Sequence, residues 1–108
     1  MEITSQQISI LERLKTQGFD IVAFPMYENY VGVRKGNCAA LLAPLDSGGF
    51  NLFGHPSYLV DGKLGVKTFQ GDGHYFVSKK EKLAVTPERA RELDAFEAEL
   101  AESLLPRA

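Results

Sequence analysis

The apolar residues of this chain follow two different spacings, and the change of spacing limits the folds that it can adopt. Near the N-terminus Ile8, Leu11 and Leu14 recur at helical intervals, and a longer apolar stripe does the same between residues 90 and 104. In the middle of the chain apolar residues occupy every second position, as in the segment 63–67. Helical spacing is typical of an amphipathic helix, and alternation is typical of a half-buried strand. The sequence therefore predicts a helix at each end and strands between them.

The ends of both helices are marked by capping residues. Thr4 and Gln7 have the spacing of a capping box, and Gly18 suits the left-handed residue that follows many helices. Thr86 can cap the second helix, and Pro87 is favoured at its first position. We therefore expect helices over residues 5–17 and 87–105.

Glycine-containing turns divide the middle of the chain into short strands. These turns lie at residues 35–37, 47–49, 61–62 and 71–73. Connections this short suit antiparallel hairpins, because parallel crossovers need a dozen or more residues. We predict a single two-layer α+β domain over residues 1–108, in which an antiparallel β-meander of about five to seven strands packs against an N-terminal and a longer C-terminal helix.

The turns also predict which strand residues lie opposite one another. A two-residue turn at Asp61-Gly62 places Leu59 opposite Leu64, and the next turn places Val66 opposite Val77. One face then collects an apolar set made of Leu59, Leu64, Val66, Tyr75 and Val77. We expect the helices to cover this more apolar face. On the other face Tyr58 lies across from Gly65, where an aromatic ring can cover exposed backbone.

Composition disfavours several classes of function. The net charge of -2 and the acidic second helix argue against a nucleic-acid partner, which needs a concentrated basic surface. The basic cluster Lys79-Lys80-Glu81-Lys82 is short, and we interpret it as a charged turn that discourages edge pairing. No apolar run is long enough for a membrane span. A single cysteine cannot form an intramolecular disulfide, and no signal peptide is visible, so we expect a cytoplasmic protein.

No catalytic residue, metal site or cofactor is assigned from the sequence. Cys38 begins an apolar strand, where a turn at Lys35-Gly36 would place it opposite Val33, and we expect it in the core. His55 and His74 are the only histidines, and neither has a second ligand at short spacing, so no metal site is expected. The glycines at 71 and 73 lack the third glycine of a dinucleotide-binding loop.

The segment 47–60 differs from the rest because it contains no Asp, Glu, Lys or Arg. Its candidates for ligand or interface contacts are Phe50, Asn51, Phe53, His55 and Tyr58. Exposed aromatics that gather on a surface mark an interface or a ligand groove. We therefore expect a small soluble, non-enzymatic binding or interaction module that contacts a second copy, another protein or a small molecule. The alternative is a small enzyme with a pocket around His55 in the same segment.

Overall fold

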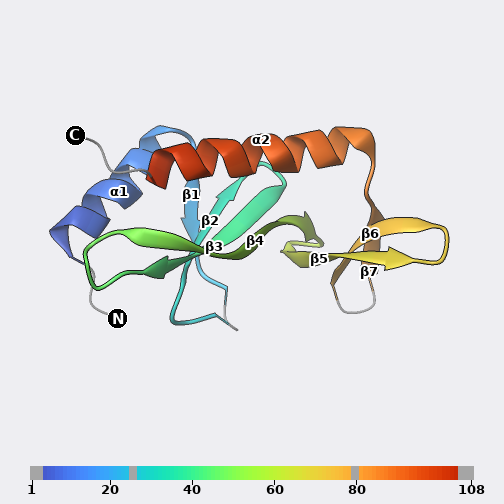
Figure 1. The fold of residues 1–108 in the computed structure, drawn as a ribbon, viewed down its shortest axis with the longest axis horizontal. Helices are drawn as coiled ribbons and strands as arrows, with labels where there is room; N and C mark the ends of the chain where they lie inside the picture. The colour runs from blue at the N-terminus through green and yellow to red at the C-terminus, as the bar shows by residue number, and fades with distance from the viewer. Residues whose placement is uncertain (1–3, 25–26, 79–80, 105–108) are drawn as a thin grey trace.

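The structure is a computed structural model that describes residues 4–24, 27–78 and 81–104 (Figure 1). Its elements follow one another as α1 (Ser5–Thr16), β1 (Asp20–Val22), β2 (Val31–Lys35), β3 (Cys38–Pro44), β4 (Phe50–Val60), β5 (Lys63–Gln70), β6 (Gly73–Ser78), β7 (Glu81–Ala84) and α2 (Pro87–Leu104). The strands form one 7-stranded sheet in sequence order, and every neighbouring pair is antiparallel. The predicted α+β meander with a helix at each end is confirmed.

Both helices begin where their capping residues predict. The Thr4 hydroxyl accepts a hydrogen bond from the Gln7 amide, and the Gln7 side chain accepts one from the Thr4 amide, which completes the capping box of α1. Gly18 follows α1 with a positive φ of 95°, in the left-handed region that favours glycine. The hydroxyl of Thr86 accepts a hydrogen bond from the Arg89 amide at the start of α2. Leu105 and Pro106, at the predicted end of this helix, lie outside the described residues.

The strand registers confirm the hairpin predictions. Leu59 lies opposite Leu64, and Val66 lies opposite Val77. The first hairpin differs in detail, because its turn is at Gly36-Asn37 and Cys38 therefore pairs with Lys35 instead of the expected Val33. This change moves the pairing by an even number of residues, so Cys38 still lies on the predicted face of the sheet.

The helices cover the opposite face from the one that we expected. The face under the helices carries Tyr58 and Phe76, whose rings stack 5.1 Å apart, while Val66 on the other face is exposed. Gly65 makes this arrangement possible, because a Cβ there would lie 2.7 Å from the Tyr58 carbonyl oxygen. The larger aromatic side chains fill the space between sheet and helices. The core includes Ile10, Leu14, Phe19, Val31, Val33, Cys38, Ala40, Leu42, Phe50, Tyr58, Val60, Phe76, Phe96 and Leu100.

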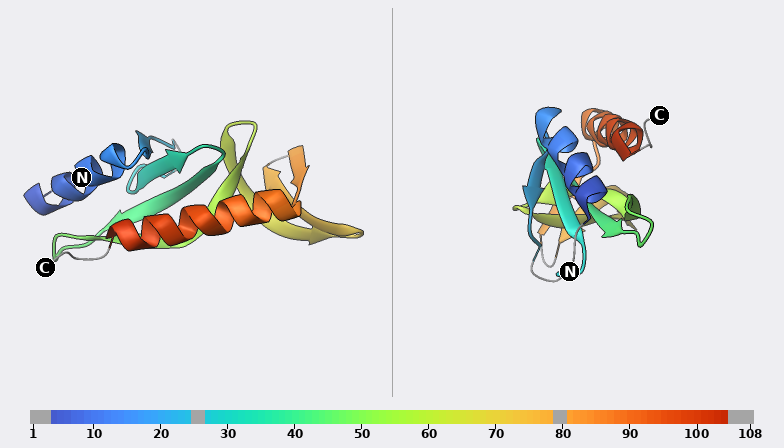
Figure 2. Two further views of the ribbon diagram at one scale, coloured as in Figure 1. Left: turned by 90° about the horizontal axis from the view of Figure 1, so that it is seen from above. Right: turned by 90° about the vertical axis from the view of Figure 1, so that its left-hand side faces the viewer.

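The domain is elongated and has a layer of helices on one side only. Its principal extents are 47 × 26 × 19 Å, and α2 runs along much of the long axis (Figure 1, Figure 2). We call the other side, which carries Gly32, Leu41, Phe53, Leu64 and Val66 by register, the helix-free face. Among the described residues, no helix combines the length and the apolar character needed to cross a membrane.

Candidate functional site

The uncharged segment 47–60 forms the turn before β4 and β4 itself, and the strand divides its candidate residues between two sides. Phe50 and Tyr58 are each only 6% exposed and belong to the core beneath the helices. Asn51 and His55 are exposed, and Phe53 is 43% exposed on the helix-free face. The five residues that the sequence analysis groups together therefore do not form one surface. Phe53 and His55 are the aromatic members that solvent reaches.

A bulge in β4 explains the exposure of His55. Ala39 of β3 pairs with Ser57 and Leu41 pairs with Phe53, so one residue of β3 faces a longer stretch of β4. Gly54 lies in this stretch with a φ of 69°, and no atom lies within 4 Å of the position that a Cβ would take. The glycine is thus needed for the backbone conformation and not to make room for a neighbour. His55 and Pro56 therefore lie at a bulge inside a strand.

A hollow of about 440 Å³ lies beside this bulge, between β4, β5 and α2. Its walls include His55, Ser57, Lys67, Asp94 and Glu97. These groups could bind a polar ligand, but no hydrogen bond or ion pair among the described residues joins His55 to Ser57 or to either carboxylate. Within residues 4–24, 27–78 and 81–104, no cluster of three or more His, Cys, Asp or Glu side chains is suited to hold a metal ion. The hollow therefore contains reactive residue types without an assembled catalytic arrangement.

The buried polar groups near the centre of α2 stabilise the fold and suppress reactivity. The Tyr58 hydroxyl donates a hydrogen bond of 2.9 Å to Glu92 Oε2, and burial followed by the nearby Glu92 raises the pKa of this phenol. The Cys38 side chain is fully buried, and burial, with a smaller effect of Glu92, raises the pKa of its thiol to about 12. A thiol with this pKa is protonated at neutral pH and is a poor nucleophile. The prediction that Cys38 belongs to the core is confirmed.

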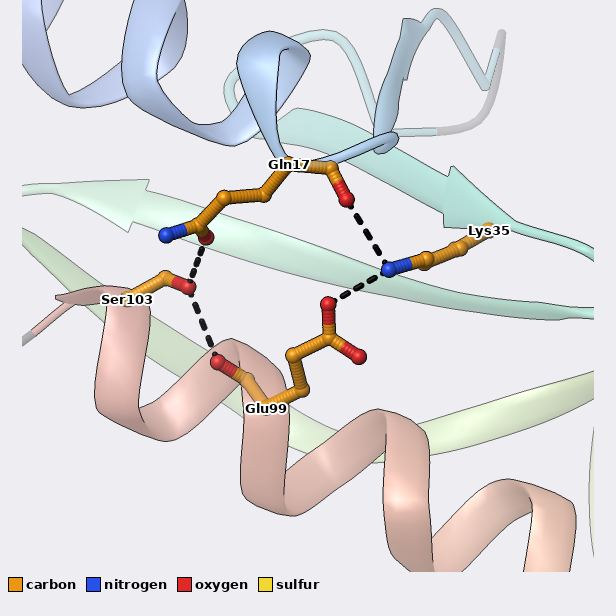
Figure 3. Close-up of polar contacts among 4 residues, drawn as sticks. All are labelled: Gln17, Lys35, Glu99 and Ser103. Carbon is orange, nitrogen blue, oxygen red and sulfur yellow. Dashed lines mark hydrogen bonds and ion pairs between the residues drawn. The ribbon is translucent and has the colours of Figure 1, made fainter.

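A second cluster of polar residues joins the two helices to β2 (Figure 3). Lys35 Nζ donates a 2.9 Å hydrogen bond to the Gln17 carbonyl oxygen and forms an ion pair with Glu99. The Ser103 hydroxyl contacts the Gln17 side chain and the Glu99 carbonyl oxygen. These contacts hold the end of α1 against α2. The ion pair is partly exposed, so we expect it to contribute less than about 1 kcal/mol.

The helix-free face contains a groove of about 480 Å³ that the sequence analysis missed. One side of the groove is formed by β1 and the segment that follows it, and the other side is formed by the turn from β4 to β5. Its lining residues are Val22, Ala23, Phe24, Tyr27, Arg34, Leu59, Gly62, Lys63, Leu64 and Ser78. Most of this lining is apolar, and the charged residues among its described members, Arg34 and Lys63, are both positive. The groove depends on how the sheet curls, which no local pattern in the sequence indicates.

Other apolar side chains extend this surface beyond the groove. Phe53 stacks on Tyr30 with ring centroids 4.2 Å apart, and Val66 is 66% exposed in the middle of β5. The segment after β1 covers part of the same face, because the ring of Phe24 lies against Gly32. The helix-free face is thus covered in part by this segment and uncovered around the groove and Val66.

The described lysines of β5 and β7 do not form one basic patch. Lys63 lines the groove, and Lys67 lines the hollow beside α2. Lys82 lies over the ring of Tyr75, with its Nζ 4.5 Å from the ring centroid. Lys79 and Lys80 lie outside the described residues.

Comparison of the chain with protein-family models, with curated proteins and with solved structures gave no match.

Proposed function

We propose that this protein is a non-enzymatic binding or interaction module, and that it makes its contact through the helix-free face. The observation that carries this proposal is the apolar groove of about 480 Å³ on that face. Concave, mostly apolar hollows of a few hundred Å³ are the usual form of a binding site. Val66 and Phe53 are exposed apolar side chains that share this face by register, which supports a contact larger than the groove itself.

The chemistry of the reactive side chains supports binding over catalysis. The thiol of Cys38 is buried and its pKa of about 12 keeps it protonated at neutral pH. Glu92 accepts the hydrogen bond of Tyr58, and Glu99 is paired with Lys35. The thiol thus belongs to the hydrophobic core, and each of the two carboxylates has a partner within the fold.

A second copy of the chain is one partner that this surface suits. Exposed apolar side chains at the centre of a sheet face are typical of surfaces that another molecule covers. We therefore include a homodimer in the proposal, with another protein or a small molecule as the other occupants. The single cysteine supports a reducing location such as the cytoplasm for this contact.

The proposal can be tested with the full chain, the apolar dye 1-anilinonaphthalene-8-sulfonate and sedimentation velocity. Val66→Glu places a charge on the helix-free face, and Ile8→Glu is the matched control because Ile8 is an exposed apolar residue of α1. We expect the wild type to bind the dye or to self-associate, Val66→Glu to lose that property, and Ile8→Glu to keep it. A wild type that does neither, or two variants that behave alike, would contradict the proposal.

The alternative function, a small enzyme, is favoured by one observation, which is the hollow of about 440 Å³ beside His55. Its walls bring a histidine, a serine and two carboxylates of α2 to one place. The test is turnover of model carboxylic and phosphate esters by the wild type. Activity that His55→Gln abolishes and that His74→Gln retains would favour the enzyme. Absence of turnover, or equal loss in both variants, would count against it.

A further inference from the structure

The groove on the helix-free face combines an apolar lining with charge of one sign. Phe24, Leu59 and Leu64 supply apolar surface on different walls. Arg34 of β2 and Lys63 at the start of β5 also line it, and none of the described aspartates or glutamates does. A cavity of about 480 Å³ lies within the range that accepts a small organic ligand.

The cations of the groove are not neutralised by ion pairs in the described part of the chain. The ion pair found there joins Lys35 to Glu99, on the side of the helices. Asp20 lies opposite Arg34 in the register of β1 and β2, but the structure has no ion pair between them. Asp61 is in the turn before Lys63, and it is likewise not paired with that lysine in the described structure. An anion entering the groove would therefore meet cations that have no ion-pair partner among the described residues.

The backbone also holds the guanidinium of Arg34 in position. Its Nε donates a 3.1 Å hydrogen bond to the Gly36 carbonyl oxygen in the β2–β3 turn. This bond uses the inner nitrogen of the side chain, and the two terminal nitrogens have no hydrogen-bond partner among the described residues. A guanidinium can donate two parallel hydrogen bonds to one carboxylate. Arg34 thus lines the groove with its terminal nitrogens available to an anionic group.

We propose that the groove binds a small free amphiphile that has one anionic head group and an apolar chain, such as a medium-chain carboxylate. The head group would lie at Arg34 and Lys63, and the chain would lie against Phe24, Leu59 and Leu64. This inference rests on the proposed function and names the class of ligand for that same surface. We favour a free molecule over a lipid in a bilayer because the cations line a concavity, whereas a bilayer presents its head groups as a broad surface.

The test uses the full chain, labelled with nitrogen-15, and three probes that separate head group from chain: decanoate, decanol and acetate. Amide shifts in two-dimensional NMR spectra give both the site and the affinity. Arg34→Gln and Lys63→Gln each remove one cation, and Lys15→Gln is the matched control on α1. We expect decanoate to shift amides around the groove and each groove variant to weaken it about fivefold, the effect of one partly exposed charge pair. Lys15→Gln should leave the affinity for decanoate unchanged, and none of the substitutions should change the affinity for decanol.

The outcomes distinguish this inference from the proposed function. The inference of an anionic ligand is overturned if decanoate binds no more tightly than decanol. It is also overturned if Arg34→Gln and Lys63→Gln leave the affinity for decanoate unchanged. In either case, decanol-induced shifts of groove amides would still support the binding surface. Binding to vesicles that contain phosphatidylglycerol, without binding to free decanoate, also overturns it. If no probe shifts groove amides and the protein neither binds the dye nor self-associates, both proposals fail.

Discussion

The ionisation of Cys38 should make the stability of this protein fall steeply at alkaline pH. The thiol is fully buried, and burial raises its pKa from 9.0 to about 12 in the folded chain. In the unfolded chain water reaches the thiol and its pKa returns toward 9.0. The contribution to stability is therefore intact below pH 9 and is lost as the pH rises from 9 toward 12.

The size of the effect follows from the difference between the two pKa values. Between the pKa of the unfolded chain and that of the folded chain, the unfolded state loses a proton that the folded state keeps. The free energy of unfolding then falls by a little over about 1 kcal/mol per pH unit. A small domain has a total stability of about 5–15 kcal/mol, so the loss of stability over one or two pH units is readily measured.

Urea unfolding of the wild type and of Cys38→Ala over a series of pH values measures this contribution. The alanine variant should lose about 1 kcal/mol at neutral pH because it leaves a small cavity. It keeps the tyrosines and lysines that also titrate at high pH, so the difference between the two proteins isolates the thiol. We expect this difference to vanish and then reverse in sign above pH 9. Curves that run parallel over the whole range would refute the argument.

Three further predictions test the packing and the polar contacts by urea unfolding. Gly32→Ala should lower the free energy of unfolding by about 2–3 kcal/mol, because the new Cβ would lie 2.5 Å from a carbonyl oxygen and 2.7 Å from an aromatic ring. Gly73→Ala is the control, since open space surrounds this glycine, and its stability should stay within about 0.5 kcal/mol of the wild type. Tyr58→Phe should cost about 1–2 kcal/mol, and a double-mutant cycle with Glu92→Gln should assign much of that loss to their 2.9 Å hydrogen bond. Gln7→Leu should cost about 1–2 kcal/mol, because it removes the side-chain donor from two turn carbonyls, each of which keeps one backbone hydrogen bond, and breaks the capping box. A loss below about 0.5 kcal/mol would contradict this.

The local structure was predictable because short-range chemistry determines it. The capping box at Thr4 and the cap at Thr86 fix where the helices begin. The turn at Asp61-Gly62 fixes the pairing of Leu59 with Leu64. In each case the residues that decide the outcome lie within a few positions of one another, so the sequence alone carries the information.

The choice of face was wrong because both faces of the sheet are partly apolar. Alternation shows that Val66 and Phe76 lie on opposite faces, but it does not show which face the helices cover. Counting apolar residues favoured the face of Val66. Volume decides the outcome instead, because the stacked rings of Tyr58 and Phe76 fill the gap above Gly65. Tertiary packing of this kind is not visible in the period of a single strand.

The candidate segment failed as a single site for a related reason. The absence of charge in residues 47–60 reflects a strand whose side chains are alternately buried, since Phe50 and Tyr58 are core residues. The bulge that exposes His55 depends on the pairing of β4 with β3. Gly54 is the only residue in the local sequence that points to this bulge. The groove brings β1 and β2 against the β4–β5 turn, and these segments are far apart in the chain. Its lining was therefore beyond a local analysis.

The wrong face and the proposed binding surface have the same physical origin. A sheet that is apolar on both sides needs cover on both, and the two helices cover only the side of Tyr58 and Phe76. The segment after β1 covers part of the remaining side through Phe24, where Gly32 lets the ring approach. Val66 receives no such cover, since it is 66% exposed at the border of the hollow beside α2. Leaving such a side chain partly in water forgoes roughly 1–2 kcal/mol of burial free energy, which a bound partner would recover.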